Sequence, residues 1–214
     1  MKSLGVMIGA LSLVAFVGCG DDTSGTGGGG QGGGGTGGGS TTTTTSSGGG
    51  EGGGAAGATC ASYCASITAN CTAGNLQYAD NTQCLAACAA FEQGTPGATS
   101  GNSLECRQYH ADFAANAPGT HCVHAGPLGT GGCEGSNGAC DGFCSIAMAE
   151  CSNIYETLAD CLTDCALNDN DVVYHQGVTT GNNLACRMYH LSVAIAQPDP
   201  HCAHIQSTDT TCSD

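Results

Sequence analysis

The stretch GNSLECRQYHADFAANAPGTHCVH, residues 101–124, returns 80 residues later as GNNLACRMYHLSVAIAQPDPHCAH, residues 181–204. Twelve of the 24 aligned positions are identical, and they include three histidines, two cysteines and one arginine. A sharp internal repeat at a fixed spacing indicates a structural unit that has been duplicated in tandem. The sequence therefore predicts two like modules, although the repeat by itself names no activity.

The composition places the chain among exported proteins that are held together by disulfides. It has 17 cysteines in 214 residues, which is typical of a disulfide scaffold and unusual for a cytosolic protein. Its 18 acidic residues outnumber three basic ones, for a formal net charge of −15. Such a surface repels phosphates, so we expect no nucleic acid among the partners and no direct binding to anionic lipid headgroups.

Residues 1–18 read as a signal peptide, because one lysine precedes an apolar run that is too short to span a bilayer. The run ends in FVGC, residues 16–19, which resembles the lipobox of bacterial lipoproteins; Phe16 stands where that motif most often has leucine. The resemblance implies cleavage before Cys19 and lipidation of its thiol. It also implies that Gly20, where aspartate is a retention signal, favours the outer membrane or cell surface. The alternative is a plain secretory signal.

The predicted localisation is therefore the bacterial cell envelope, with contact to the membrane through the lipid anchor only. The number of cysteines supports a separate role for Cys19, because the other sixteen divide eight and eight between the repeats. Residues 20–59 between this cysteine and the first module are rich in glycine, serine and threonine. We expect this segment to be a disordered tether, since it has too little apolar surface to offset the entropy of ordering.

The cysteine pattern predicts an all-α, small, disulfide-rich fold: two tandem three-helix modules, 60–133 and 140–212, with four disulfides each. Cys60, Cys64 and Cys71 fall on one narrow stripe of a helix, and Cys84 and Cys88 form a similar stripe on a second helix. The predicted disulfide cysteines are Cys60, Cys64, Cys71, Cys84, Cys88, Cys106, Cys122, Cys133, Cys140, Cys144, Cys151, Cys161, Cys165, Cys186, Cys202 and Cys212.

Paired CxxxC helices resemble the helical hairpins of CHCH and α-hairpinin proteins over about thirty residues of each module. The resemblance supports a local shape and no function. It implies the nested pairs Cys60–Cys88 and Cys64–Cys84, and would leave Cys71 for Cys106 and Cys122 for Cys133. Since eight cysteines allow 105 pairings, the sequence does not determine the last two bridges.

A third helix is predicted from Asn102 or Ser103, which are good N-cap residues, to about Asn116, before Pro118. Its expected inward face is Cys106, Tyr109, His110 and Phe113, repeated as Cys186, Tyr189, His190 and Val193. The large apolar residues expected in the first module are few: Ile67, Leu76, Leu85, Phe91, Leu104 and Phe113. With so small a core, we expect the disulfides to dominate the stability of each module.

Three histidines in each repeat are candidate metal ligands. His110 lies one helical turn after Cys106, and His121 and His124 flank Cys122. Imidazole suits zinc and copper, and three histidines with one open position are typical of reactive zinc rather than purely structural zinc. The alternative is that these histidines are buried hydrogen-bonding groups without a metal. The candidate ligands are His110, His121, His124, His190, His201 and His204.

Arg107 and Arg187 occupy the same place in the two repeats and are the only basic side chains outside the leader. A structural role as a fixed ion pair, or as a fork that binds helix carbonyls, is the first interpretation. The alternative is a clamp for a carboxylate or phosphate ligand.

No catalytic motif is present. The chain has no CxxCH, no G-x-S-x-G, and no CxxC within a βαβ pattern. The sequence favours a non-catalytic, surface-tethered lipoprotein that acts as a binding or envelope component. The first alternative is a protein that binds zinc or copper through its histidines, and the second is an unrecognised hydrolase or redox enzyme.

Overall fold

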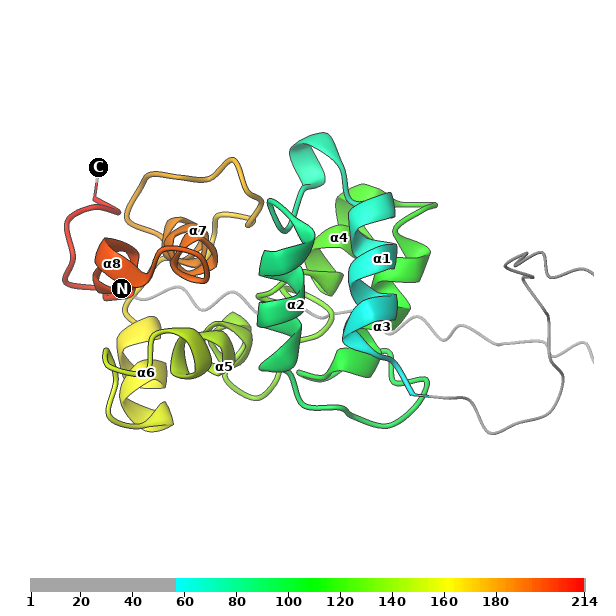
Figure 1. Cartoon of the computed structure of the whole chain (residues 1–214), viewed down its shortest axis with the longest axis horizontal. Helices are drawn as coiled ribbons and strands as arrows, with labels where there is room; N and C mark the ends of the chain where they lie inside the picture. Colours follow the sequence, from blue (N-terminus) through cyan, green and yellow to red (C-terminus); the bar gives the residue numbers. More distant parts are fainter. Residues whose placement is uncertain (1–56, 214) are drawn as a thin grey trace, which may run out of the picture. The chain divides into compact units, whose positions relative to one another are not determined.

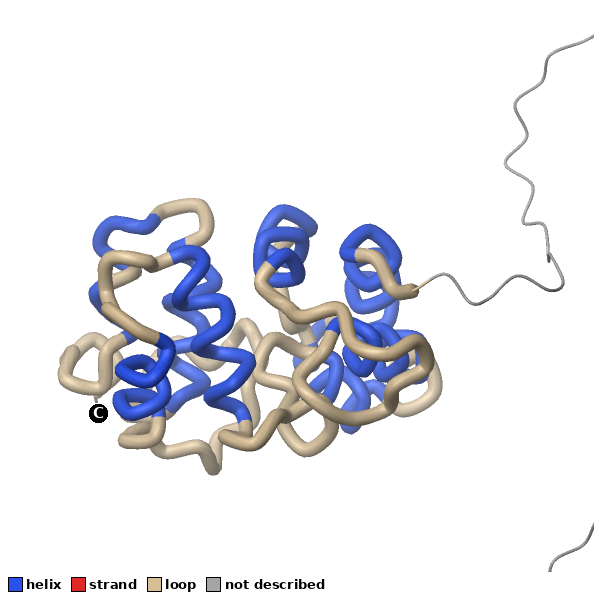
Figure 2. Tube along the Cα trace, turned by 90° about the horizontal axis from the view of Figure 1, so that it is seen from below, coloured by secondary structure: helices blue, strands red, loops and turns tan. Residues whose placement is uncertain are grey.

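The computed structural model describes residues 57–213, and in this part of the chain the predicted fold class is confirmed: it is all-helical and rich in disulfides. The signal peptide, Cys19 and the tether up to residue 56 lie outside the described residues. The first repeat contains α1 (Cys60–Asn70), η1 (Ala73–Asn75), α2 (Asn81–Ala89), α3 (Leu104–Phe113) and α4 (Pro118–Ala125). The second contains α5 (Ala139–Glu150), α6 (Leu158–Cys165), α7 (Leu184–Ala194), α8 (Pro198–His201) and η2 (Ala203–Ile205). Helices and loops alternate through this part without a strand (Figure 2).

Side chains at the N-caps explain where several helices begin. Thr59 forms a capping box at the start of α1, and Thr157 forms one at the start of α6. Ser103 accepts a hydrogen bond from the backbone N–H of Cys106, and Asn183 does the same for Cys186. The predicted N-cap of the third helix is therefore confirmed at Ser103, because its side chain satisfies an otherwise unpaired donor.

Each repeat has a fourth helical segment that the sequence did not predict, so the three-helix description is wrong. Pro118 interrupts the chain after α3, but it is also the first residue of α4, where a missing N–H costs nothing. Pro198 plays the same part at the start of α8. The proline that was expected only to end one helix also begins the next.

The disulfide pairing is confirmed for the helical hairpin and wrong for the remaining cysteines. Cys60–Cys88 and Cys64–Cys84 clamp α1 against α2 as the resemblance implied. The other bridges are Cys71–Cys122 and Cys106–Cys133, because α4 brings Cys122 to the end of α1 while the following loop returns Cys133 to α3. The second repeat has the same topology: Cys140–Cys165, Cys144–Cys161, Cys151–Cys202 and Cys186–Cys212.

The core of the first repeat is more aromatic than expected. Tyr63 is fully buried, and its hydroxyl lies 2.9 Å from that of Tyr78 and donates to the Ala125 carbonyl oxygen at 2.6 Å. Two residues expected in the core are on the surface instead, since Leu85 is 38% and Phe113 is 45% exposed. Phe113 points away because the buried face of α3 runs through His110, Ala111 and Ala114.

The two repeats form one compact unit (Figure 1). Residues of the loop before α7 bind a non-helical segment of the first repeat that lies between η1 and α2. The backbone N–H of Gln176 donates to the Leu76 carbonyl oxygen at 2.8 Å, and the Tyr174 hydroxyl donates to that of Gln77 at 3.3 Å. The Gln77 side chain is buried and donates to the Tyr174 carbonyl oxygen in return. Hydrogen bonds to backbone groups therefore fix how the second repeat meets the first.

Candidate metal centres

The three predicted histidines of the first repeat converge. His110 lies on α3, and His121 and His124 lie three residues apart on one side of α4. The Cys71–Cys122 disulfide is attached to α4 at Cys122, between the two histidines that α4 supplies. One ring nitrogen from each histidine lies within 4.8 Å of the others. The three histidines that the sequence repeat singled out therefore lie together, although the sequence did not predict α4, which carries His121 and His124.

Two of these rings face each other directly. The Nδ1 atoms of His110 and His121 are 2.9 Å apart, and their rings are stacked. The Nε2 atom of His110 lies 3.2 Å from the Thr99 carbonyl oxygen, which can only accept a hydrogen bond. This contact places the proton of His110 on Nε2 and leaves the lone pair of Nδ1 directed at His121. Such an outer hydrogen bond fixes the tautomer in metal sites built from histidine.

The third histidine completes the cluster at a right angle. The His124 ring lies edge-on to His110, with 4.7 Å between ring centroids. Its Nδ1 atom is buried and has no hydrogen-bond partner. A Cβ atom on Gly132 would lie 2.6 Å from the Cγ atom of His124, so only glycine allows this approach to the ring. A buried ring nitrogen without a partner is unfavourable unless something else binds it.

The second repeat reproduces this arrangement. The Nδ1 atoms of His190 and His201 are 3.1 Å apart in stacked rings, and His204 lies edge-on to His190 at 5.0 Å between centroids. The His204 Nδ1 atom is again buried without a partner. One contact differs, because the His190 Nε2 atom is also buried and unpartnered, whereas its counterpart in His110 meets a carbonyl.

The surroundings favour the neutral, metal-binding form in two histidines of each triad. Burial, and then the neighbouring imidazoles, lower the pKa of His110 and His124. The same two causes lower the pKa of His190 to about 4 and also lower that of His201. These four rings are therefore neutral near pH 7, and the neutral imidazole is the ligand.

The donor set fits a tetrahedral metal ion. Two nitrogens bound to zinc at about 2.0–2.1 Å lie roughly 3.3 Å apart, close to the spacings of the facing Nδ1 pairs. The sulfur atoms of Cys106 and Cys133 also lie near His110. They are joined in a disulfide and so offer no thiolate. Nitrogen is thus the donor that each site presents.

The arginines bind oxygens of the backbone and of asparagine. Arg107 is fully buried and stacks on Phe91, with its Cζ atom 3.9 Å from the ring centroid. It donates to the carbonyl oxygens of Ser103, Gly126 and Pro127 and to Asn102 Oδ1 at 2.8–3.3 Å. Arg187 donates in the same way to Asn168, Asn182, His204, Ser207 and Asp209.

Of the two structural roles predicted for the arginines, the described part of the chain shows the fork that binds uncharged oxygens and not the ion pair. The reason is local. In each repeat the chain at and after the last histidine passes the guanidinium, and its backbone carbonyl oxygens accept from the arginine N–H groups. Two of the acceptors of Arg107, Gly126 and Pro127, directly follow α4. The arginine therefore fixes the end of the helix that carries His121 and His124.

No helix within residues 57–213 combines the length and the apolar character that crossing a membrane requires. Residues 51–136, which contain the first repeat, match the BfoA family C-terminal domain. The chain is also similar to Aurasperone B biosynthesis cluster protein A from two strains of Aspergillus niger. Each match is 37% identical over 67 residues, which are 31% of this chain. No solved structure matches significantly. The chain spans 22% of the length of each of these curated relatives, and its similarity to the BfoA C-terminal domain lies around the first repeat.

Proposed function

We propose that each repeat binds one transition-metal ion, zinc or copper, through its three histidines. The observation that carries this proposal is the duplicated geometry: in both repeats two Nδ1 atoms face each other at 2.9 and 3.1 Å, and a third ring closes the cluster with a buried, unpartnered nitrogen. A purely structural cluster would be expected to pair those nitrogens, because leaving one buried and unbonded is costly. A metal ion bound at that nitrogen would remove this cost at both places.

Three imidazoles leave one coordination position open to water or to another ligand. A metal held in this way supplies a Lewis acid and, in the case of zinc, a bound water of lowered pKa. The residues of this chain hold the ion and exclude sulfur from it. Arg107 fixes the end of α4, Thr99 sets the proton of His110, and the Cys71–Cys122 disulfide sets the position of His121 and His124.

We further propose that the sites are presented by a surface-tethered, non-catalytic lipoprotein that captures metal at the bacterial cell envelope. The support is the lipobox-like FVGC at residues 16–19, the glycine-rich segment that follows it, and the even number of cysteines that remains once Cys19 is set aside. Mass spectrometry of the exported chain tests this directly. An acylated Cys19 at the N-terminus is expected, and an unmodified start at another residue would overturn it.

Metal analysis of the purified full chain tests the metal proposal. We expect about two equivalents of zinc or copper per chain, one for each repeat. The double variant His110→Gln/His190→Gln removes the ligand that both triads place on the long helix, so its binding should fall to background. The matched control is His175→Gln, the seventh histidine, which lies outside both triads and accepts from the Gly177 N–H. Substoichiometric metal in the parent, or retention in the double variant, would contradict the proposal.

A further inference from the structure

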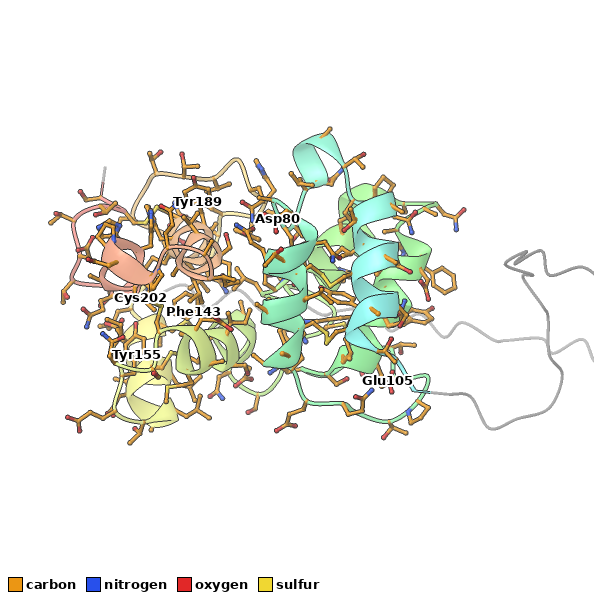
Figure 3. The ribbon with its side chains drawn as sticks, viewed as in Figure 1. Asp80, Glu105, Phe143, Tyr155, Tyr189 and Cys202 are labelled. Atoms are coloured by element: carbon orange, nitrogen blue, oxygen red, sulfur yellow. A yellow bond between two sulfur atoms is a disulfide. The ribbon has the colours of Figure 1, made fainter. Side chains whose placement is uncertain are left out.

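The first repeat has an open groove that lies apart from its histidines. It has a volume of about 480 Å³ and lies between α1, α3 and the loop that precedes α3. Six helical side chains line it: Ser62, Ser66, Glu105, Gln108, Tyr109 and Asp112. Glu105 lies beside the start of α1, where the described part of the chain begins (Figure 3).

Five of these six positions are buried in the second repeat. Eighty residues further on, these five become small or apolar residues, with serine as the one remaining hydroxyl, whereas Tyr109 recurs as Tyr189 and is half-buried. Ser62 and Asp112 are exposed, whereas their counterparts are buried. The five buried counterparts are Gly142, Ile146, Ala185, Met188 and Ser192. One face of the module is therefore open in one copy and covered in the other.

The first repeat lies against this face at two of the positions. A Cβ atom on Gly142 would lie 2.3 Å from the Pro127 carbonyl oxygen, so α5 lies directly on the chain that follows α4. The Gln176 side chain links Ser192 of α7 to the Gln77 carbonyl oxygen at 3.2 Å for each contact. In the second repeat two carbonyl groups of the first repeat, from Pro127 and Gln77, thus lie at this face of the module.

In the first repeat the same face carries acidic and amide oxygens. The Asp112 carboxylate accepts from Ser66 Oγ at 2.6 Å and from Gln108 Nε2 at 2.9 Å, and these contacts hold it at the wall of the groove. Glu105 accepts from the backbone N–H of Ala58. Both arginines of the described part are fully buried elsewhere, so no basic side chain there neutralises this face. Its charge is complementary to a basic partner.

We propose that this groove is a docking site for an extended peptide segment of a partner protein that carries a lysine or arginine side chain. On the repeat-related face of the second repeat, non-helical residues of the first repeat, Pro127 and Gln77, lie close by through their carbonyl oxygens. The two carboxylates select the positive charge. A second copy of this chain is a poor occupant, because a formal charge of −15 makes the copies repel each other. This inference does not rest on the metal sites.

Nuclear magnetic resonance on the ¹⁵N-labelled full chain tests the proposal, with the capped pentapeptides Ala-Ala-Lys-Ala-Ala and Ala-Ala-Glu-Ala-Ala as probes. We expect the lysine peptide, and not the glutamate peptide, to shift the amide signals of Ser62, Ser66 and Gln108. Asp112→Ser, which installs the residue of the second repeat, should weaken this binding about threefold to fivefold. Asp171→Asn removes an equal charge from an exposed site outside the groove and should leave the affinity unchanged.

Two results would overturn the docking site. One is a set of shifts spread over the whole acidic surface and equally sensitive to both substitutions, which is the signature of non-specific attraction. The other is concentration-dependent shifts at the groove without peptide, which would assign the face to a second copy. Either result leaves the metal stoichiometry of the histidine variants as a separate question.

Discussion

His110 and His121 direct their Nδ1 atoms at each other across 2.9 Å, and His190 and His201 repeat this contact at 3.1 Å. The contact joins α3, which begins at Leu104, with the short helix α4, which begins at Pro118. Because each pair lies beside a third imidazole, the duplication has preserved a nitrogen cluster rather than a single buried histidine.

The two sites should differ in affinity. His110 donates through Nε2 to the Thr99 carbonyl, whereas His190 Nε2 has no partner. Outer hydrogen bonds of this kind change metal affinity about 10- to 100-fold. In calorimetric titrations with zinc, His190→Gln, which keeps the first site, should therefore bind at least about tenfold more tightly than His110→Gln, which keeps the second. Equal affinities would show that the Thr99 contact does not matter.

Removing the Cys71–Cys122 disulfide should weaken both stability and metal binding. It closes a loop of 51 residues and holds the helix that carries two ligands. The double variant Cys71→Ala/Cys122→Ala should lose about 4 kcal/mol of unfolding free energy on the loop-entropy relation. Urea denaturation and zinc titration measure the two effects.

The matched control for that experiment is Cys64→Ala/Cys84→Ala. This bridge closes a loop of 20 residues in the hairpin and joins α1 to α2, neither of which carries a histidine ligand. Its loss should lower stability by about 3 kcal/mol but leave the zinc affinity near that of the parent. If both double variants lost metal equally, the Cys71–Cys122 disulfide would affect metal binding only through overall folding, and not by positioning the ligands.

Arg107→Lys should be strongly destabilising although it conserves charge. The guanidinium donates to four oxygen acceptors, and the single ammonium group of lysine cannot reach them all. We expect a loss of about 2–4 kcal/mol in the unfolding free energy, measured by denaturant titration. A change of less than about 0.5 kcal/mol, the usual effect of a surface substitution, would refute this role.

The metal-free protein should lose stability as the pH falls from about 6.5 to about 4. The pKa of His190 is lowered from 6.5 to about 4 by burial and by its neighbours. In that window the unfolded chain binds the proton and the folded chain does not, so the unfolded state is stabilised relative to the folded state as the pH falls. Above pH 6.5 this contribution is constant. Denaturation midpoints recorded across the window should fall less steeply for His190→Gln than for the parent.

The sequence predicted the histidine triads, the helical hairpin and the N-cap at Ser103, because each depends on side chains at fixed spacing. It failed where tertiary contacts decide. The second role of Pro118 as a helix start depends on the segment after it packing on α3. The pairing of Cys71 with Cys122 depends on the position of that helix. The contact of His110 with Thr99 is made by a backbone carbonyl oxygen, so the type of residue at position 99 gives no indication of it. The exposure of Phe113 likewise reflects which face of α3 the core selects.

X-ray absorption spectroscopy of the zinc-loaded full chain is the most direct test of the central claim. We expect a first shell of nitrogen or oxygen atoms only, at about 2.0–2.1 Å, with the multiple-scattering signature of imidazole. A sulfur shell at about 2.3 Å would contradict it, because the cysteines near the triads are all paired as disulfides.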